Sequence, residues 1–367
     1  MKIALIAFTK NGGKMCKKAC AILQTQGNQC SAYGMKETAE DNGLIPVEKG
    51  LSKWAKEAFE HQEALVFIGA TGIAVRAIAP YIKSKKEDPA ILVIDEKAQY
   101  VISLLSGHLG GANRLTRILA ECLDAVPIIT TATDINGKFA VDVWAQENQL
   151  TIKNMKAAKQ VSADVLNGKL VYLYSAYKME GTIPPELKIV DAVTLKDKIQ
   201  EGETCIVITE KILDALKGKE EKVLQLIPRN ISVGIGCKKG VSFNQVNDFL
   251  KDTITKAELN AEAIQRFASI DLKKEEPALN KLSKKWDIPF QTYTGEQLMA
   301  VQGEFTASNF VRSITGVENV CERAAVLSSD NGELIWKKDA QNGVTIAIAK
   351  REIILKFMEI DECGHCI

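Results

Sequence analysis

The hydrophobic positions of this chain form short apolar runs, each followed by a stretch with helical spacing. Lys2–Phe8 is an apolar run rich in strand formers, and in Lys14–Gln26 the apolar residues recur every three or four positions. The same alternation returns further along, with strands expected at Ala64–Ile68, Ile91–Ile94, Tyr100–Leu105 and Val126–Thr131. It predicts a mostly parallel sheet covered by helices, with ligands bound where strands end and helices begin.

Beyond residue 140 the pattern changes and then resumes. The middle of the chain has strand candidates at Leu170–Ser175 and Cys205–Thr209, and we find no chemistry-bearing cluster there. A third unit opens with strand Ile231–Ile235 and helix Phe243–Thr255, for which Ser242 is a plausible cap. Strand candidates at Glu333–Trp336 and Val344–Ile348 indicate a final hairpin.

This pattern predicts an α/β protein of three parts. Mostly parallel sheets flanked by helices are expected in the N- and C-terminal parts, around a smaller middle domain. The predicted parts are an N-terminal domain at 1–136, a middle domain at 137–225, a C-terminal domain at 229–352 and a tail at 353–367. Within the tail, Asp361–Ile367 is expected to be frayed.

Composition narrows the classes of function. The 367 residues include 47 basic and 46 acidic side chains, and this balance argues against a dedicated nucleic-acid binder. No stretch reaches the roughly 18 uncharged apolar residues of a membrane span, and no secretory signal is visible. Nine scattered cysteines favour reduced thiols. We therefore expect a soluble cytoplasmic protein with no membrane partner.

The densest cluster of candidate chemistry is Ser106-Gly107-His108-Leu109-Gly110-Gly111-Ala112-Asn113, which ends one expected strand and opens a helix. Histidine titrates near neutrality, so His108 is a candidate acid or base, although a structural histidine is the alternative. The segment matches neither a nucleophile elbow nor a dinucleotide fingerprint. The residues expected to bind substrate here are Ser106, Gly107, Gly110, Gly111, Asn113 and Arg114.

Other strand-to-helix turns carry glycines or hydroxyls. Gly69, Thr71 and Gly72 precede a helix whose N–H groups favour an anion, and Arg76 would add a bidentate partner; a plain tight turn is the alternative. Thr130–Asp134 ends the next strand. Asp134 either helps to cap a helix or lines the one ligand cleft on which the glycine-rich turns are expected to converge.

Two further turns belong to the third unit. Gly236, Lys238 and Lys239 form a candidate anion cradle, against the alternative of a solvated basic turn. Ser313 and Thr315 precede a helix and either bind substrate or cap that helix. In the tail, Cys363-Gly364-His365-Cys366 lacks a second cysteine pair, so a frayed end is favoured over a zinc site.

Several of these segments resemble one family. Phe67–Pro80, Val93–Asn113 and Pro127–Asp134 are similar to the N-terminal domain of the cobalt-precorrin-5A hydrolases, the CbiG family of anaerobic cobalamin biosynthesis. Ser232–Ser242 and Ser313–Ala325 resemble its C-terminal domain, which CobE proteins share. The order and spacing fit over nearly the whole chain, and the Ser106–Asn113 block is the specific part.

The resemblance implies a corrinoid substrate, a cobalt-containing ring-contracted tetrapyrrole with a δ-lactone between C20 and the ring A acetate. The enzyme would open the lactone with water and release C20 with its methyl as acetaldehyde, which leaves cobalt-precorrin-5B. His108 and Asp134 are the candidate catalytic residues. The cobalt would belong to the substrate, so no protein-held metal or cofactor is expected. Other enzymes of the pathway or a second copy of the chain are the expected protein partners.

Two other functions fit the same glycine turns. A non-catalytic tetrapyrrole carrier of the cobalamin pathway would bind the same carboxylates but release no acetaldehyde. A nucleotide-dependent enzyme would use the turns for phosphate, although the missing fingerprints argue against it.

Overall fold

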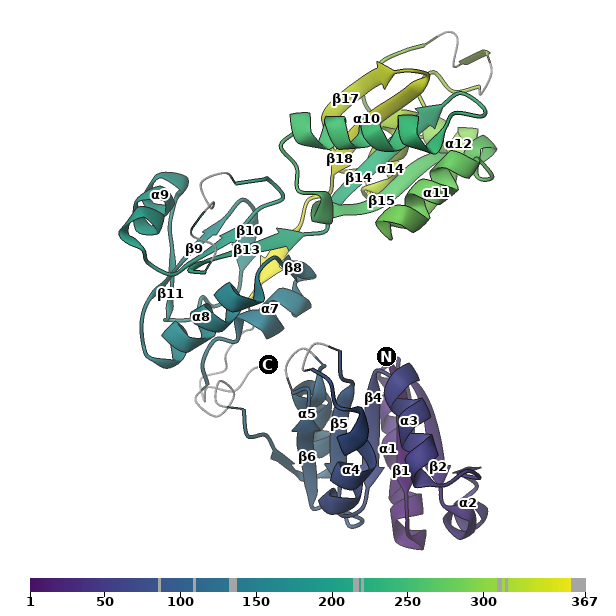
Figure 1. Ribbon diagram of the computed structural model, residues 1–367, viewed down its shortest axis with the longest axis vertical. Helices are drawn as coiled ribbons and strands as arrows, with labels where there is room; N and C mark the ends of the chain where they lie inside the picture. The colour runs from purple at the N-terminus through teal and green to yellow at the C-terminus, as the bar shows by residue number, and fades with distance from the viewer. Residues whose placement is uncertain are drawn as a thin grey trace. The chain divides into compact units, whose positions relative to one another are not determined.

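The computed structural model describes residues 1–84, 87–107, 110–131, 137–213, 218, 221–308, 312–313 and 316–357. The chain divides into two compact units, Met1–Val143 and Trp144–Ile367 (Figure 1). The predicted α/β class is confirmed in both units. None of the helices in the described part of the chain has the length and apolar character that a membrane span requires.

The first unit is built on a seven-stranded sheet with the order β3-β2-β1-β4-β5-β6-β7. Its elements are β1 (Lys2–Ala7), α1 (Lys10–Thr25), β2 (Gln29–Gly34), α2 (Lys36–Asn42), β3 (Ile45–Pro46), α3 (Leu51–His61), β4 (Ala64–Ile68), α4 (Thr71–Ile78), η1 (Ala79–Tyr81), β5 (Ala90–Ile94), β6 (Tyr100–Leu105), α5 (Ala112–Leu123) and β7 (Val126–Ile128).

The two faces of this sheet are covered by different helices. Every residue of β4 and β5 is buried, as an apolar run inside such a sheet requires. On one face, alternate strand residues pack against α1 and α5, which contribute Leu23 and Leu119 to the core. On the other face, the remaining strand residues pack against α3 and α4, which contribute Trp54 and Ile78 (Figure 1).

The direction of the chain reverses between β5 and β6. The Asp95 carboxylate accepts hydrogen bonds from the backbone N–H groups of Lys97 (2.9 Å) and Tyr100 (2.6 Å), which closes a tight turn. As a result β6 runs antiparallel to β5, with Ile94 opposite Val101. Because β7 then pairs parallel to β6, both of these strands end at the edge where β1, β4 and β5 begin. We call this the amino edge of the sheet, and the opposite one the carboxyl edge.

The second unit contains two five-stranded sheets. The middle sheet has the order β11-β9-β12-β13-β8, and all its pairs are parallel except β13 with β8. Its elements, with α7 at the start, are α7 (Val141–Glu147), β8 (Leu150–Ile152), α8 (Met155–Leu166), β9 (Val171–Ser175), β11 (Leu187–Ile189), α9 (Ala192–Glu201), β12 (Cys205–Ile208) and β13 (Val223–Pro228).

The C-terminal sheet has the order β16-β15-β14-β18-β17. The first three strands are parallel. β18 pairs antiparallel with β14 and forms with β17 the hairpin that the sequence predicted. The elements are β14 (Ile231–Cys237), α10 (Phe243–Lys256), η3 (Ala261–Ala263), β15 (Ile264–Ile270), η4 (Asp271–Lys273), α11 (Pro277–Trp286), β16 (Phe290–Tyr293), α12 (Gly295–Met299), α14 (Cys321–Ser328), β17 (Glu333–Gln341) and β18 (Val344–Lys350). The predicted Ser242 cap of α10 is confirmed.

The chain returns to the middle domain after β18, so the start of the predicted tail is ordered. β19 (Ile354–Lys356) pairs with β10 (Lys178–Glu180), and the Phe357 ring stacks on Trp144 at 4.6 Å. Burial of apolar side chains on the middle domain explains this order, which a short terminal segment does not reveal by itself. Residues 358–367, with the cysteine-rich end, lie outside the described residues.

Candidate functional site

The two glycine-rich corners of the first unit lie at opposite edges of its sheet. Gly69 follows β4 at the carboxyl edge, where its N–H donates to the Ile94 carbonyl (2.8 Å). Ser106 follows β6 at the amino edge, where its hydroxyl donates to the Asp88 carbonyl (2.9 Å). The length of β5 separates them, roughly 13 Å at 3.3 Å per residue. The expectation that both corners line one cleft is therefore wrong, because the β5–β6 turn reverses the chain.

The described residues of this segment, Ser106, Gly107 and Gly110–Asn113, form a tight corner at the amino edge. The backbone N–H groups of Ala112 and Asn113 donate to the carbonyls of Ser106 (3.2 Å) and Gly107 (2.9 Å), so the loop folds back on the start of α5. A Cβ on Gly107 would lie 2.7 Å from Asn113 Oδ1, and one on Gly110 would lie 2.4 Å from the Ser106 Cβ. These glycines therefore permit the close approach on which the corner depends.

Asn113 connects three segments at this edge. Its side chain is 4% exposed; Oδ1 accepts from the Ser103 hydroxyl of β6 (2.7 Å), and Nδ2 donates to the Thr131 hydroxyl after β7 (3.0 Å). A buried amide bonded on both sides is held in place, because displacing it would leave buried polar atoms without a partner. The 106–113 corner and the segment that ends at Thr131, far apart in sequence, thus share one hydrogen-bonded anchor.

Both predicted catalytic residues belong to segments that this anchor touches. His108 and Asp134 lie outside the described residues, and their roles stay predictions. Their described neighbours, Gly107 and Thr131, both contact the Asn113 side chain. Arg114, one residue further on, is exposed and has no partner among the described residues.

The 69–72 corner has a more open structure. Gly69 has a φ of 153°, which favours glycine. Gly72 is exposed, as is Arg76, which has no partner among the described residues; Thr71 is half-buried. Across the same edge, the Thr9 hydroxyl donates to Glu96 (2.8 Å) and caps α1 at the Gly12 N–H (3.0 Å). A protein carboxylate thus already lies beside this expected anion site.

The turn at 236–240 has fewer free donors than its sequence suggested. Gly236 lies within β14, and the Lys238 N–H donates to the Gly343 carbonyl (2.9 Å). The Gly240 N–H donates to the Glu276 carboxylate (3.1 Å), while the side chains of Lys238 and Lys239 are exposed. Ser313 is exposed in the described chain, and Thr315 lies outside it. Substrate binding by these residues stays a prediction.

The cysteines of the C-terminal domain are poor nucleophiles. Burial raises the pKa of the Cys237 thiol to about 11, and that of Cys321 also to about 11. Thiols with such pKa values are protonated near neutrality, so thiolate chemistry is disfavoured. Within the described residues, no group of three or more His, Cys, Asp or Glu side chains is placed to hold a metal ion.

Comparison with known proteins accounts for most of the chain. The family model described as "Cobalamin synthesis G N-terminal" matches residues 53–134, "Cobalamin biosynthesis central region" matches 139–228, and "Cobalamin synthesis G C-terminus" matches 231–349. A cobalt-precorrin-5A hydrolase of Salmonella typhimurium is 35% identical over 94% of this chain and 97% of its own length. This chain belongs to the CbiG family. The family resemblance seen in the sequence is thereby confirmed.

Other members and related structures are more distant. A cobalt-precorrin-5A hydrolase of Priestia megaterium is 29% identical, over 94% of each chain. The crystal structure of a putative cobalamin biosynthesis protein G homolog from Sulfolobus solfataricus has 25% identity and a TM-score of 0.41, over 96% of this chain and 97% of its own. The structure of CobE, from the cobalamin biosynthetic pathway, covers 34% of this chain and 92% of its own, with 27% identity and a TM-score of 0.32.

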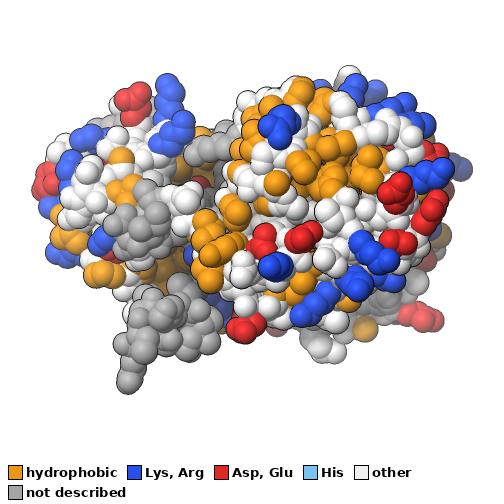
Figure 2. Space-filling model, turned by 90° about the horizontal axis from the view of Figure 1, so that it is seen from below, with side chains coloured by type: hydrophobic (Ala, Val, Ile, Leu, Met, Phe, Trp, Pro, Cys, Tyr) orange, Lys and Arg blue, Asp and Glu red, His pale blue; other side chains and the backbone are white. Residues whose placement is uncertain are grey.

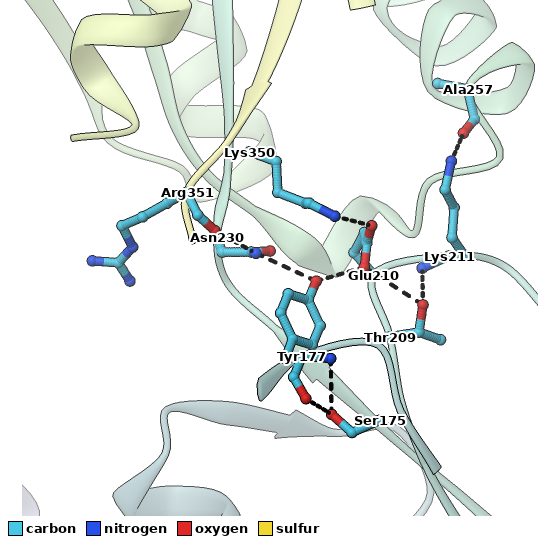
Figure 3. Close-up of polar contacts among 9 residues, drawn as sticks. All are labelled: Ser175, Tyr177, Thr209, Glu210, Lys211, Asn230, Ala257, Lys350 and Arg351. Carbon is cyan, nitrogen blue, oxygen red and sulfur yellow. Dashed lines mark hydrogen bonds and ion pairs between the residues drawn. The ribbon is translucent and has the colours of Figure 1, made fainter. Parts of the chain in front are cut away.

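Sequence analysis missed a buried polar cluster in the second unit of this CbiG-family chain (Figure 3). The Tyr177 hydroxyl donates to Glu210 (2.5 Å), whose carboxylate also pairs with Lys350 (3.2 Å). Asn230 donates to the Tyr177 oxygen (3.3 Å) and to the Arg351 carbonyl (2.9 Å). The cluster joins the middle domain to the two chain segments that lead into and out of the C-terminal domain.

Burial and hydrogen bonding act in opposite directions in this cluster. Burial is the largest single effect on Glu210 and disfavours its ionised form, but the hydrogen bonds from Tyr177 and the backbone and the charge of Lys350 together outweigh it and lower the pKa. Burial, followed by the bond to the ionised Glu210, raises the pKa of Tyr177. The one signal in the sequence was a carboxylate directly after the buried run Cys205–Thr209, and its partner Lys350 lies 140 residues away.

Figure 2 shows how charge is distributed on one face of the protein. Lys and Arg side chains are interspersed there with Asp and Glu and with apolar patches. This matches the near-zero net charge of the sequence. To bind an anionic ligand, this face would therefore depend on a few well-placed cations and not on a broad basic surface.

Proposed function

We propose that this protein hydrolyses the δ-lactone of cobalt-precorrin-5A and releases acetaldehyde, which leaves cobalt-precorrin-5B. Relatives named cobalt-precorrin-5A hydrolase, at 35% and 29% identity over most of the chain, support this activity. We place the reacting lactone at the amino edge of the N-terminal sheet, beside the 106–113 corner and the segment after β7.

The reaction has two steps. Water adds to the lactone carbonyl and the ring C–O bond breaks, which gives the ring A acetate and a hydroxyl on C20. Loss of the proton from that hydroxyl then breaks the bond between C20 and the macrocycle. C20 leaves with its methyl as acetaldehyde, and the electron pair stays on the macrocycle, which is the electron acceptor.

The protein has to move protons and orient the lactone. His108 is the proposed base for the attacking water, because its unperturbed pKa lies near working pH. His108 or Asp134 then takes the proton of the C20 hydroxyl. Backbone N–H groups of the 106–113 corner would stabilise the oxyanion that develops on the lactone carbonyl.

One observation carries this placement: the Asn113 amide is bonded to Ser103 and to Thr131. This amide holds together, at one edge of the sheet, the described residues beside His108 and those before Asp134, the two candidate bases. Such an anchor is what a reaction needs if an acid–base pair is to keep its geometry through two proton transfers.

The direct test is incubation of the purified protein with cobalt-precorrin-5A under anaerobic conditions, with acetaldehyde measured by a coupled alcohol dehydrogenase assay. Stoichiometric acetaldehyde and a product with the mass of cobalt-precorrin-5B are expected. Binding of the corrinoid without acetaldehyde would overturn the proposal and favour the carrier.

A further inference from the structure

Three neighbouring parallel strands of the middle sheet end in one polar cluster. The second residue beyond the end of β9 is Tyr177, beyond β12 it is Glu210, and beyond β13 it is Asn230. The chain passes from β9 to β11 on one side and then to β12 on the other, so the strand order reverses between β9 and β12. In α/β sheets, ligands bind outside the carboxyl ends of the strands at such a reversal. The cluster therefore stands where the middle sheet would receive a ligand.

That place is taken by a side chain of the C-terminal sheet. Lys350 is the last residue of β18, and its ammonium group pairs with the Glu210 carboxylate at 3.2 Å (Figure 3). The same ammonium group lies over the Tyr177 ring, 5.6 Å from the ring centroid. The Glu210 side chain is 5% exposed and that of Lys350 is 26% exposed. Lys350 thus contacts the ends of two middle strands as a cationic ligand would.

The backbone around Glu210 is bonded to the C-terminal domain as well. The Glu210 carbonyl accepts from the Asn260 N–H (2.8 Å), and the Ile212 N–H donates to the Glu258 carbonyl (2.8 Å). Both partners lie between α10 and η3, a segment far in sequence from Lys350. The main chain and the side chain of Glu210 therefore hold two separate parts of the neighbouring domain.

The cluster is suited to holding charges in place and not to moving protons. Burial raises the pKa of Tyr177, and so does the hydrogen bond to Glu210. Against the effect of burial, the hydrogen bond from Tyr177 and the charge of Lys350 lower the pKa of Glu210. Near neutrality the phenol therefore stays protonated and the carboxylate stays ionised, whereas an acid or base should titrate near the working pH. A buried carboxylate that stays ionised needs a cation beside it.

We propose that Glu210 and Lys350 form a latch that makes the middle and C-terminal domains move as one body. Relative motion is the usual state of domains that share a small interface, and here two short connectors, 229–230 and 351–353, would otherwise act as a hinge. The middle sheet thus uses the carboxyl ends of its strands to hold its neighbour and not to bind a small molecule. This inference goes beyond the proposed function and does not depend on it.

Cleavage of the full-length protein by an arginine-specific protease measures how often the joint opens. Arg229 is exposed on the first connector, but the next residue, Asn230, is fully buried and its carbonyl accepts from the Arg351 N–H (2.9 Å). Cleavage after Arg229 therefore requires the connector to leave its bonded position. Arg266 lies within β15, so cleavage there reports unfolding of the C-terminal sheet itself.

Lys350→Met should open the joint, because it leaves the buried Glu210 carboxylate without its cation. The rate of cleavage after Arg229 should rise about tenfold or more. Cleavage after Arg266 should stay within about twofold of wild type, because the C-terminal sheet keeps its own core. Mass spectrometry of the fragments gives both rates from one digest.

Lys153→Met is the matched control. Lys153 follows β8 of the middle sheet and pairs with Glu262 of the C-terminal domain at 2.8 Å, but the two side chains are 44% and 43% exposed. An exposed pair contributes little, so the rate after Arg229 should change by less than about twofold in K153M. The two lysine variants thus compare a buried and an exposed ion pair across the same joint.

The double variant E210Q/K350M tests whether the charge pair itself is the latch. It removes both charges, so no buried ion is left without a partner, and the rate after Arg229 should return to within about threefold of wild type. A lysine that acted only through packing would give no such recovery. If K350M fails to fold, E210Q breaks the same pair from the other side and is compared with the same double variant.

Three results would overturn the latch. They are equal cleavage in K350M and K153M, an equal rise after Arg229 and after Arg266 in K350M, and a double variant that is cleaved as fast as the single one. The measurement needs no substrate, so a protein that releases no acetaldehyde contradicts the proposed function alone.

Discussion

The two glycine-rich corners of the N-terminal sheet look alike in sequence but differ in construction. The 69–72 corner follows a parallel strand, and its one close neighbour at Gly72 is the end of the flexible Arg76 side chain. The 106–113 corner follows an antiparallel strand and packs on the buried Asn113 amide. A strand–glycine–helix pattern thus predicts the local turn, whereas the direction of the preceding strand decides at which edge of the sheet that turn lies.

The difference also bears on function. In the described part of the chain, only the amino-edge corner has a side-chain hydrogen bond to a second segment that leads to a candidate base. The carboxyl-edge corner has instead a protein carboxylate, Glu96, bonded to Thr9 beside it. Variants at the 106–113 corner should therefore affect turnover, whereas variants at the 69–72 corner should leave it nearly unchanged.

The largest expected effect is that of His108→Ala. Loss of the proposed base should lower the rate of acetaldehyde release by about 10²-fold or more. His61→Ala is the matched control, because His61 is exposed at the end of α3 and should be dispensable. Near-normal release from H108A would remove His108 from the chemistry.

Asn113→Ala should have the next largest effect. It leaves the Ser103 and Thr131 hydroxyls without their partner, which should cost about 1–3 kcal/mol of unfolding free energy. Looser geometry at the amino edge should lower kcat about tenfold or more. Chemical denaturation and single-turnover kinetics measure the two effects. A folded N113A variant with wild-type kcat would show that the anchor is irrelevant to catalysis.

A paired alanine substitution contrasts the corners directly. Gly107→Ala places a Cβ 2.7 Å from Asn113 Oδ1 and should cost about 1–3 kcal/mol of stability, with kcat about fivefold lower. Gly72→Ala meets only Arg76 Nη2, at 3.4 Å, and lies in a helix, so it should stabilise by up to about 1 kcal/mol. Thermal unfolding and turnover of both variants check this, and equal effects would remove the contrast.

The smallest effect is expected for Arg76→Gln. Arg76 is exposed at the carboxyl edge, so kcat/KM should fall by less than about threefold, as expected for a solvated charge. Steady-state kinetics at low and moderate ionic strength would measure it. A loss of more than tenfold would place substrate recognition at the carboxyl edge and reverse the comparison.

Much of the fold follows from apolar periodicity, but three features depend on distant contacts. The β5–β6 reversal depends on Asp95 bonding two backbone N–H groups, and the sequence shows only a polar turn there. Gly234 lies in mid-strand because a Cβ would meet the Cys321 carbonyl oxygen of α14 at 1.8 Å, a packing role that no local pattern reveals. The Tyr177–Glu210–Lys350 cluster joins residues 33 and 140 positions apart.

The candidate site was predictable in the same uneven way. The sequence marked the Ser106–Asn113 block as the densest cluster of candidate chemistry, and its link to the segment after β7 was expected only as a shared cleft. The role of Asn113 as the connecting amide could not be read from the sequence, because its partner Ser103 lies within β6 and its partner Thr131 follows β7.

If the corrinoid reacts at the amino edge of the N-terminal sheet, bound product should protect backbone amides there. Hydrogen–deuterium exchange with and without cobalt-precorrin-5B measures this protection. Within the N-terminal unit, bound product should slow exchange in peptides that cover 103–107, 112–115 and 126–131. Peptides that cover 8–13 and 69–76 should exchange as fast as in the unliganded protein. Protection confined to 8–13 and 69–76 would contradict this placement.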